Sequence, residues 1–364
     1  MALQLLSDPL YLCAGLAFGR GGLLPLVTAQ HAIEIGAELG LLLLLLFLGL
    51  EYSAEKLLSG LCRSYPSGAV DLVLNAAPGA VTGFLLDLGP EGALALGGVT
   101  YISSSGIAAK LLRDMGWAKT REGGAVVSIL IIEDLAMAAY LSILAVVLRG
   151  DDAGTGAASI ALALGFVAVL LYVASRWGGV ISRLVFSHSD EGVLLSILGV
   201  TFLLAGVSEL VGVSAAVGSL LVGVVLSGSA AERAHDLLAP LRDLFAAWFF
   251  VFFGLTIDPG TLPPVLLPAV VLAVMTAATK VATGWWSATR AGADRRGCVR
   301  AGAVLIARGE FSIAIAGIAV SSGLDPRLGA LAAAYVVILA TLGPILTRVA
   351  DPLAARRAGV RMGA

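Results

Sequence analysis

The sequence predicts an all-α integral membrane protein built from inverted repeats, with two discontinuous helices that cross. Three observations support this fold class. Hydrophobic residues make up 59% of the chain and charged residues only 13%, whereas about a quarter of the residues in a soluble domain are charged. The apolar segments mostly have the length of one bilayer crossing, which takes about 20 residues. Finally, two segments with polar residues at mid-membrane match each other at a fixed offset.

Twelve apolar segments are predicted to span the membrane. Every second loop, starting after the second segment, is rich in lysine and arginine, and these loops hold most of the 23 basic residues. Positive loops mark the cytoplasmic side of a membrane, so both termini are predicted to be cytoplasmic in a multi-pass protein of the cell membrane. The segments are 8–19, 31–50, 67–87, 91–112, 122–149, 156–176, 192–210, 213–228, 241–257, 263–289, 299–321 and 328–348.

An internal repeat relates the two parts of the chain. Residues 41–56 resemble 246–261, and the same offset of 205 aligns 97–107 with 302–312. The loop charges give the matched segments opposite orientations, which is typical of transporters with inverted repeats. The predicted division has a first repeat, a linking helix with its loop, a second repeat and a short cytoplasmic tail, at 1–149, 150–189, 190–350 and 351–364.

The two repeats differ in their number of segments. Six segments follow residue 190, but only five precede the linking segment 156–176. The segment 192–210 therefore has no counterpart in the first repeat. We expect an apolar segment of about 20 residues to be encoded directly upstream of Met1.

Two segments have the composition of interrupted helices. Ser103, Ser104 and Ser105 lie in the middle of one, and Arg308 and Glu310 flank a glycine at the matching depth of the other. Unwound backbone inside a membrane is tolerated only where protein or a water-filled cavity satisfies its polar groups. The ends of the half-helices can then supply carbonyl groups to a cation. Small residues that only permit close helix packing are the alternative interpretation.

Two adjacent carboxylates, Glu133 and Asp134, lie inside the segment 122–149. Inserting a carboxylate into the centre of a membrane costs about 2.5–3.5 kcal/mol, and such residues usually face an ion pathway. Neighbours on a helix point about 100° apart, so the two side chains are expected to serve different spaces. Lys280, deep in another segment, is predicted to form a salt bridge with Glu133. Arg308 is the alternative partner of Glu133, or it pairs with Glu310.

These residues give the chain a resemblance to the membrane domain of the monovalent cation:proton antiporter-2 family, which includes Kef-type potassium efflux systems and bacterial sodium/proton antiporters. The resemblance covers nearly the whole chain. It implies a plan of thirteen spans with crossed broken helices, of which the first is missing here, and a homodimer. The residues that carry it are 41–56, the Ser103–Gly106 break with Lys110 and Arg113, the Glu133–Asp134 pair, 250–259, and Gly309 to Phe311.

The resemblance also implies roles for single residues. Asp134 matches the aspartate that binds the ion, so a monovalent cation is expected there, and Lys280 matches the family's buried cation. Glu133 departs from the family, which has Asp, Asn or Gln at that position. Kef-type members carry a cytosolic nucleotide-binding domain after the last helix. The short tail here implies that any such regulation comes from a separate subunit.

The predicted function is secondary-active exchange of protons for potassium or sodium, with Ser103, Ser104 and Ser105 replacing part of the cation's hydration shell near Asp134. The protein is not expected to be an enzyme or to need a cofactor, and its net charge of −2 indicates no nucleic-acid partner. Alternatives are a cation channel, which needs a filter of ringed ligands, and a sodium-coupled organic-anion symporter. An intramembrane aspartyl protease would need a second membrane-embedded aspartate, and none is predicted in the sequence.

Overall fold

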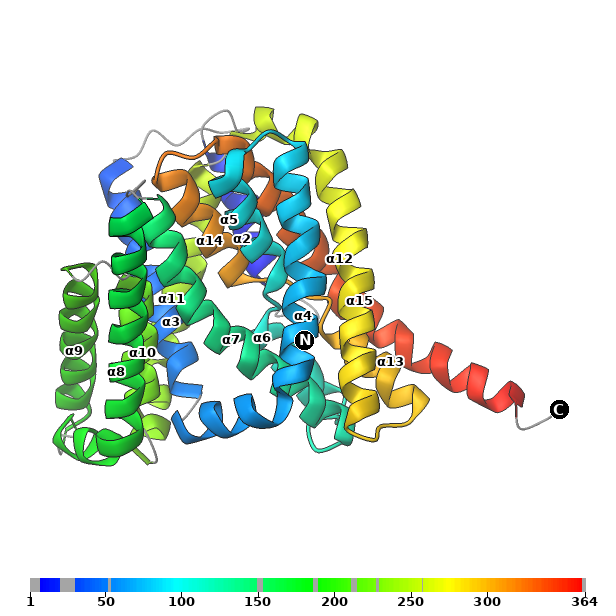
Figure 1. Ribbon diagram of the computed structural model, residues 1–364, viewed down its shortest axis with the longest axis horizontal. Coiled ribbons are helices and arrows are strands. Elements are labelled where there is room, and N and C mark those ends of the chain that lie inside the picture. The colour runs from blue at the N-terminus through cyan, green and yellow to red at the C-terminus, as the bar shows by residue number, and fades with distance from the viewer. Residues whose placement is uncertain are drawn as a thin grey trace. The chain divides into compact units, whose positions relative to one another are not determined.

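The computed structural model describes residues 7–19, 30–51, 54–148, 153–185, 189–210, 215–226, 229–256 and 258–361, which form helices, turns and short connections without any strand (Figure 1). Each predicted segment coincides with one helix, or in two cases with a pair. The elements are α2 (Ser7–Phe18), α3 (Gln30–Glu51), α4 (Ala54–Leu85), α5 (Gly89–Tyr101), α6 (Ser105–Asp114), α7 (Arg121–Leu148), α8 (Ala153–Val185), α9 (Asp190–Leu210), α10 (Ala215–Val225), α11 (Ser229–Thr256), the 3-10 helix η1 (Pro259–Thr261), α12 (Leu262–Arg290), α13 (Arg295–Val304), α14 (Glu310–Ser321) and α15 (Pro326–Arg361).

Six helical segments among the described residues are long and apolar enough to cross a membrane. The predicted twelve crossings and the inverted orientation of the repeats remain predictions. The six segments are Tyr65–Leu85, Gly89–Leu112, Arg121–Leu148, Asp190–Leu210, Pro259–Arg290 and Pro326–Ala350.

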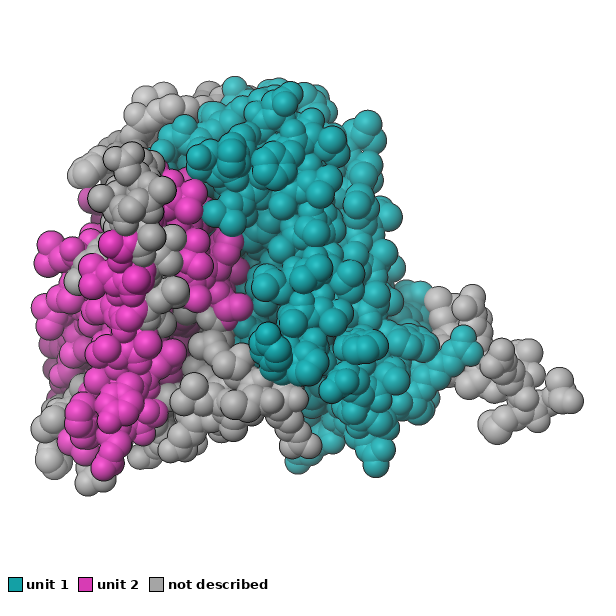
Figure 2. Space-filling model, in the orientation of Figure 1, with its two compact units in different colours: residues 1–26, 60–134, 253–364 teal, residues 27–59, 135–252 magenta. Residues whose placement is uncertain are grey.

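The chain forms two compact units, which Figure 2 colours separately. Unit 1 comprises residues 1–26, 60–134 and 253–364, and unit 2 comprises 27–59 and 135–252. The chain therefore passes from one unit to the other several times. The predicted repeats, 1–149 and 190–350, describe internal symmetry and are a different division of the chain. All the candidate site residues lie in unit 1.

Unit 1 contains both predicted interruptions. One separates α5 from α6 at residues 102–104, and the other separates α13 from α14 at residues 305–309. The two interruptions contact each other, because the backbone N–H of Ser104 donates to the carbonyl of Ala307 at 2.9 Å. In the internal repeat, the offset of 205 aligns residues 102–104 with 307–309, which belong to the second interruption.

A polar seam between α4 and α12 positions the remaining site residues. On α4, Ser67, Asp71 and Asn75 are spaced four residues apart and are all buried, so they lie on one face of the helix. The buried face of α12 likewise carries polar residues, and its opposite face is apolar and exposed. The buried polar residues of α12 are Thr276, Lys280, Thr283 and Ser287, and the exposed apolar ones include Leu267, Val271 and Val274.

In unit 2, α10 packs against α3 through two facing glycines, Gly49 and Gly223. A Cβ atom added to Gly223 would lie 2.6 Å from the Cα of Gly49 and 2.6 Å from the backbone nitrogen of Leu50. The absence of side chains therefore lets the two backbones approach each other closely. Buried residues of both helices, including Leu46, Phe47 and Val222, fill the adjacent core.

Changing Gly223 to Ala is therefore expected to destabilise unit 2, by about 1–3 kcal/mol as is typical of overpacked sites. Gly199→Ala on α9 is the matched control, because no atom lies within 4 Å of the added Cβ atom and alanine is the better helix former. Thermal unfolding in detergent should show a lower midpoint for Gly223→Ala only. Equal midpoints for the two variants would contradict the close contact of α3 with α10.

Candidate functional site

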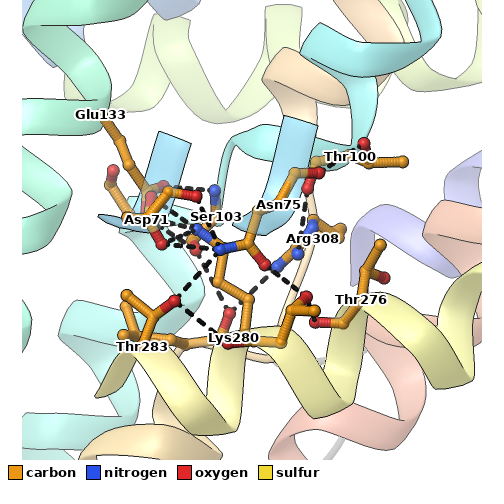
Figure 3. Close-up of polar contacts among 12 residues, drawn as sticks. Asp71, Asn75, Thr100, Ser103, Glu133, Thr276, Lys280, Thr283 and Arg308 are labelled. Atoms are coloured by element: carbon orange, nitrogen blue, oxygen red, sulfur yellow. Dashed lines mark hydrogen bonds and ion pairs between the residues drawn. The ribbon is translucent and has the colours of Figure 1, made fainter. Parts of the chain in front are cut away.

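The centre of the site is Lys280, whose ammonium group binds two carboxylates at once (Figure 3). Its Nζ atom lies 2.7 and 3.0 Å from the two carboxylate oxygens of Asp71 and 2.8 Å from Oε1 of Glu133. All three side chains are at most 1% exposed. The predicted ion pair between Glu133 and Lys280 is thus present, but a second carboxylate shares the lysine.

Asp71 is fixed by the polar seam. The Asn75 side-chain amide donates to an Asp71 carboxylate oxygen at 2.9 Å and lies 3.2 Å from the Thr283 hydroxyl. Thr279 in turn donates to the Asn75 side-chain oxygen at 2.7 Å. Because these bonds join α4 to α12, they hold both Asp71 and Lys280 in a defined position.

Glu133 connects Lys280 to the first helix interruption. One of its carboxylate oxygens accepts a hydrogen bond from the backbone N–H of Ser103. The Ser103 hydroxyl lies 3.2 Å from the other oxygen and 3.2 Å from the carbonyl of Leu305, which belongs to the second interruption. Glu133 therefore satisfies a buried backbone N–H in the interruption between α5 and α6.

The side chain of Asp134, a residue of α7, lies next to the beginning of α6. The Ser105 hydroxyl is within 3.0 and 3.2 Å of its two carboxylate oxygens, and both residues are buried. Ser105 is the first residue of α6, and the positive end of a helix favours a nearby carboxylate. As expected for neighbours on a helix, Glu133 and Asp134 have different partners: one binds Lys280 and the other accepts from Ser105.

Arg308 binds backbone carbonyls at both helix interruptions. Its guanidinium donates to the carbonyls of Leu305 at 3.0 Å, Ile306 at 3.1 Å and Thr100 at 3.1 Å, with Ala307 at 3.5 Å. It also donates to the Tyr335 hydroxyl at 3.0 Å. The charge of Arg308 thus offsets the negative C-terminal ends of α5 and α13. Of the two partners considered for Arg308 from the sequence, Glu133 binds Lys280 and the backbone of Ser103 instead. Pairing with Glu310 stays a prediction, because the Glu310 side chain lies outside the described part of the structure.

The remaining predicted residues have simpler places. Ser104 caps α6, since its hydroxyl lies 3.4 Å from the backbone nitrogen of Ile107. Its side chain also contacts Gly309, where an added Cβ atom would lie 2.6 Å from the serine oxygen. Glu310 begins α14, but its side chain lies outside the described part of the structure.

Asp71 and Asn75 are site residues that were not predicted from the sequence. The statement that the membrane holds no second aspartate is wrong, because Asp71 is fully buried within the segment Tyr65–Leu85. The signal was available, since two polar residues four positions apart interrupt an apolar helix. Asp71 binds Lys280, an arrangement suited to neutralising a lysine in the protein interior.

The site therefore has two parts with different chemistry. In the first, Asp71, Lys280 and Glu133 form a closed ionic cluster in which each charge has an opposite neighbour. In the second, Asp134 and Ser105 place carboxylate and hydroxyl oxygens, the ligand type that hard cations prefer, beside the helix interruptions. No group of three or more His, Cys, Asp or Glu side chains among the described residues is arranged to hold a metal ion.

Comparison with known proteins gives consistent matches over most of the chain. The family model for the sodium/hydrogen exchanger, transmembrane, matches residues 5–350. The K(+)/H(+) antiporter subunit KhtU of Bacillus subtilis is 34% identical over 89% of this chain and 81% of its own length. The ammonium/H(+) antiporter subunit AmhT of Alkalihalophilus pseudofirmus is 26% identical over 97% and 89%.

A solved structure shares the fold. The sodium proton antiporter MjNhaP1 from Methanocaldococcus jannaschii matches with a TM-score of 0.67, and the match covers 96% of this chain and 91% of the other. The two sequences are 19% identical, so this likeness concerns the arrangement of helices alone.

Proposed function

Since this chain belongs to the sodium/hydrogen exchanger family, we propose that it exchanges a monovalent cation for protons and that both bind in turn at Asp134. It is a secondary transporter, not an enzyme. Coupling needs no covalent chemistry, because a site that holds either a proton or a cation, but never both, links their movements when it faces the two sides of the membrane alternately.

The division of the two carboxylates is the observation that supports Asp134 as the carrier. Glu133 is committed to Lys280 and to the backbone of Ser103, and releasing it would leave a buried ammonium with one partner fewer. Asp134 lies beside Ser105 at the start of a half-helix, where oxygen ligands are close. Ser103, Ser104 and Ser105 with nearby carbonyls would replace part of the cation's hydration shell.

We propose potassium as the first cation and sodium as the second. The names of the relatives include potassium, sodium and ammonium, so all three ions belong in the assay. The proposed architecture has twelve spans in inverted repeats, with both termini cytoplasmic. We also propose that the protein is a homodimer and that, within each protomer, one compact unit moves against the other during transport. A separate regulatory subunit is also proposed, consistent with the word subunit in the name of KhtU.

Proteoliposomes with a trapped pH dye test the exchange directly. Vesicles are made acidic inside, and potassium, sodium, ammonium, lithium or rubidium is then added outside. Alkalinisation of the lumen that depends on the added cation and on the protein supports the proposal. A cation current without proton movement would indicate a channel instead, and cation movement that requires an organic anion would indicate a symporter.

Competition at one carboxylate predicts how the transport depends on pH. A proton bound to Asp134 excludes the cation, so lowering the pH should weaken the apparent cation affinity while the maximal rate at saturating cation changes less. Once the pH is below the pKa of the site, the cation concentration for half-maximal exchange should rise about tenfold per pH unit, because binding requires the deprotonated ligand. An affinity that does not change with pH would contradict a shared site.

A further inference from the structure

One end of unit 1 is a basic surface formed by three connected chain segments. The loop before α7, the start of α7 and the hairpin between α12 and α13 meet there (Figure 1). The Arg121 guanidinium donates to the carbonyl of Gly292 at 2.9 Å, and Arg300 forms an ion pair with Glu122 at 3.0 Å. These contacts fix the hairpin to α7, so the side chains around it form one surface.

Positive charge dominates this surface, which we call the basic end and define as residues 114–122 and 285–300. Two of its three acidic residues are engaged within the protein: Glu122 binds Arg300, and Asp294 caps α13 by accepting from the backbone of Gly297 at 2.7 Å. The exposed basic side chains are those of Lys119, Arg121, Arg290 and Arg295.

The basic end also carries the features of a membrane interface. Trp285 and Trp286 are 38% and 46% exposed at the end of α12, and the outer face of this helix is apolar over most of its length. Tryptophans in such places lie at the level of lipid headgroups. The Arg290 guanidinium lies 5.9 Å from the centre of the Trp286 ring, so an exposed cation is fixed next to an interfacial aromatic ring.

We propose that the basic end binds the headgroup of an anionic phospholipid, with Arg290 and Arg295 contacting the phosphate. Guanidinium groups suit this ligand, since they present paired donors to phosphate oxygens. The tryptophans mark the level of the lipid headgroups. The exposed Arg290 and Arg295 lie close to them in sequence, one on each side of the short loop between α12 and α13. An acidic protein segment would satisfy the charges but would not explain the exposed tryptophans beside them.

Lipid binding here would act on the transport machinery through the hairpin. α12 carries Lys280, and α13 leads directly into the second interruption. A headgroup that bridges Arg290 and Arg295 would hold the end of α12 to the beginning of α13. The bound lipid should therefore raise the thermal stability of unit 1, which can be measured without any transport assay.

The test is a titration of the purified full chain in neutral detergent with dioleoylphosphatidylglycerol, followed by thermal unfolding and by native mass spectrometry. Dioleoylphosphatidylcholine and inorganic phosphate serve as the zwitterionic and the lipid-free comparison. We expect only phosphatidylglycerol to raise the unfolding midpoint and to remain bound. Each arginine removed should weaken the apparent lipid affinity about fivefold, or about 1 kcal/mol per charge.

The variants Arg290→Gln, Arg295→Gln and the double variant are compared with Arg176→Gln. Arg176 is a matched control, because it is an exposed arginine next to the exposed Trp177 on α8, in unit 2. A loss of the lipid effect in the double variant with retention in Arg176→Gln supports the proposal. An equal phosphatidylglycerol effect in the wild type and the double variant would overturn it, as would an equal effect of phosphatidylcholine or inorganic phosphate.

Discussion

Replacing Asp134 with asparagine is expected to abolish cation-dependent proton exchange while the protein still folds. Asparagine keeps the shape of the side chain and can accept from Ser105, which lies 3.0 Å from the carboxylate. It cannot release a proton or offer a charge to a cation, so neither half of the exchange cycle can proceed. The measurement is cation-induced proton efflux from liposomes at several pH values, with thermal unfolding to establish folding.

Glu133→Gln is the matched comparison, because it changes the adjacent carboxylate by the same chemistry. Lys280 keeps its pair with Asp71 in this variant, so transport should be weakened or altered in its pH dependence but should persist. Robust exchange by Asp134→Asn would refute the assignment of the carrier, and Glu133 or Glu310 would then have to be tested in its place.

The largest effect on stability is expected for Lys280→Met. This change leaves Asp71 and Glu133 buried together without the ammonium that binds both, and removing one partner of a buried ion pair typically destabilises by about 3–5 kcal/mol. Asp71→Asn and Glu133→Gln should be milder, because in each the lysine retains one carboxylate and the cluster becomes a neutral pair. Thermal unfolding in detergent measures all three.

Combined variants separate this charge effect from a simple loss of packing. Lys280→Met with Glu133→Gln should recover only part of the stability, because Asp71 stays charged, whereas adding Asp71→Asn removes the last buried charge. The triple variant should therefore be more stable than Lys280→Met alone. If Lys280→Met is no worse than the single carboxylate changes, the three residues do not form one ionic cluster.

The helical segments and the two interruptions could be predicted from the sequence, because both depend on local composition. A run of apolar residues of bilayer length forms a helix wherever it lies, and Ser103 to Ser105 and Gly309 mark where the backbone leaves the helix. The ion pair between Glu133 and Lys280 could also be predicted, because each buried charge in a membrane needs an opposite partner.

The partners of Asp71 and Arg308 could not be predicted in the same way. Asp71 meets Lys280 only because α4 packs beside α12, and the internal repeat does not indicate which helices are neighbours. Arg308 binds carbonyls that become available only after α5 and α13 have ended. Counting charges suggests only carboxylate partners for Arg308 and does not reveal these polar groups of an unwound backbone.

The hydrogen bond between Ser104 and Ala307 also has a consequence for biosynthesis. The first interruption leaves the ribosome about 200 residues before the second, or roughly 10–40 s earlier at ordinary rates of translation. During that interval the N–H of Ser104 lacks its final acceptor, so a nascent chain that has inserted only its first half is incompletely paired inside the bilayer. The contact between the two interruptions can therefore form only after the second half of the chain has been synthesised.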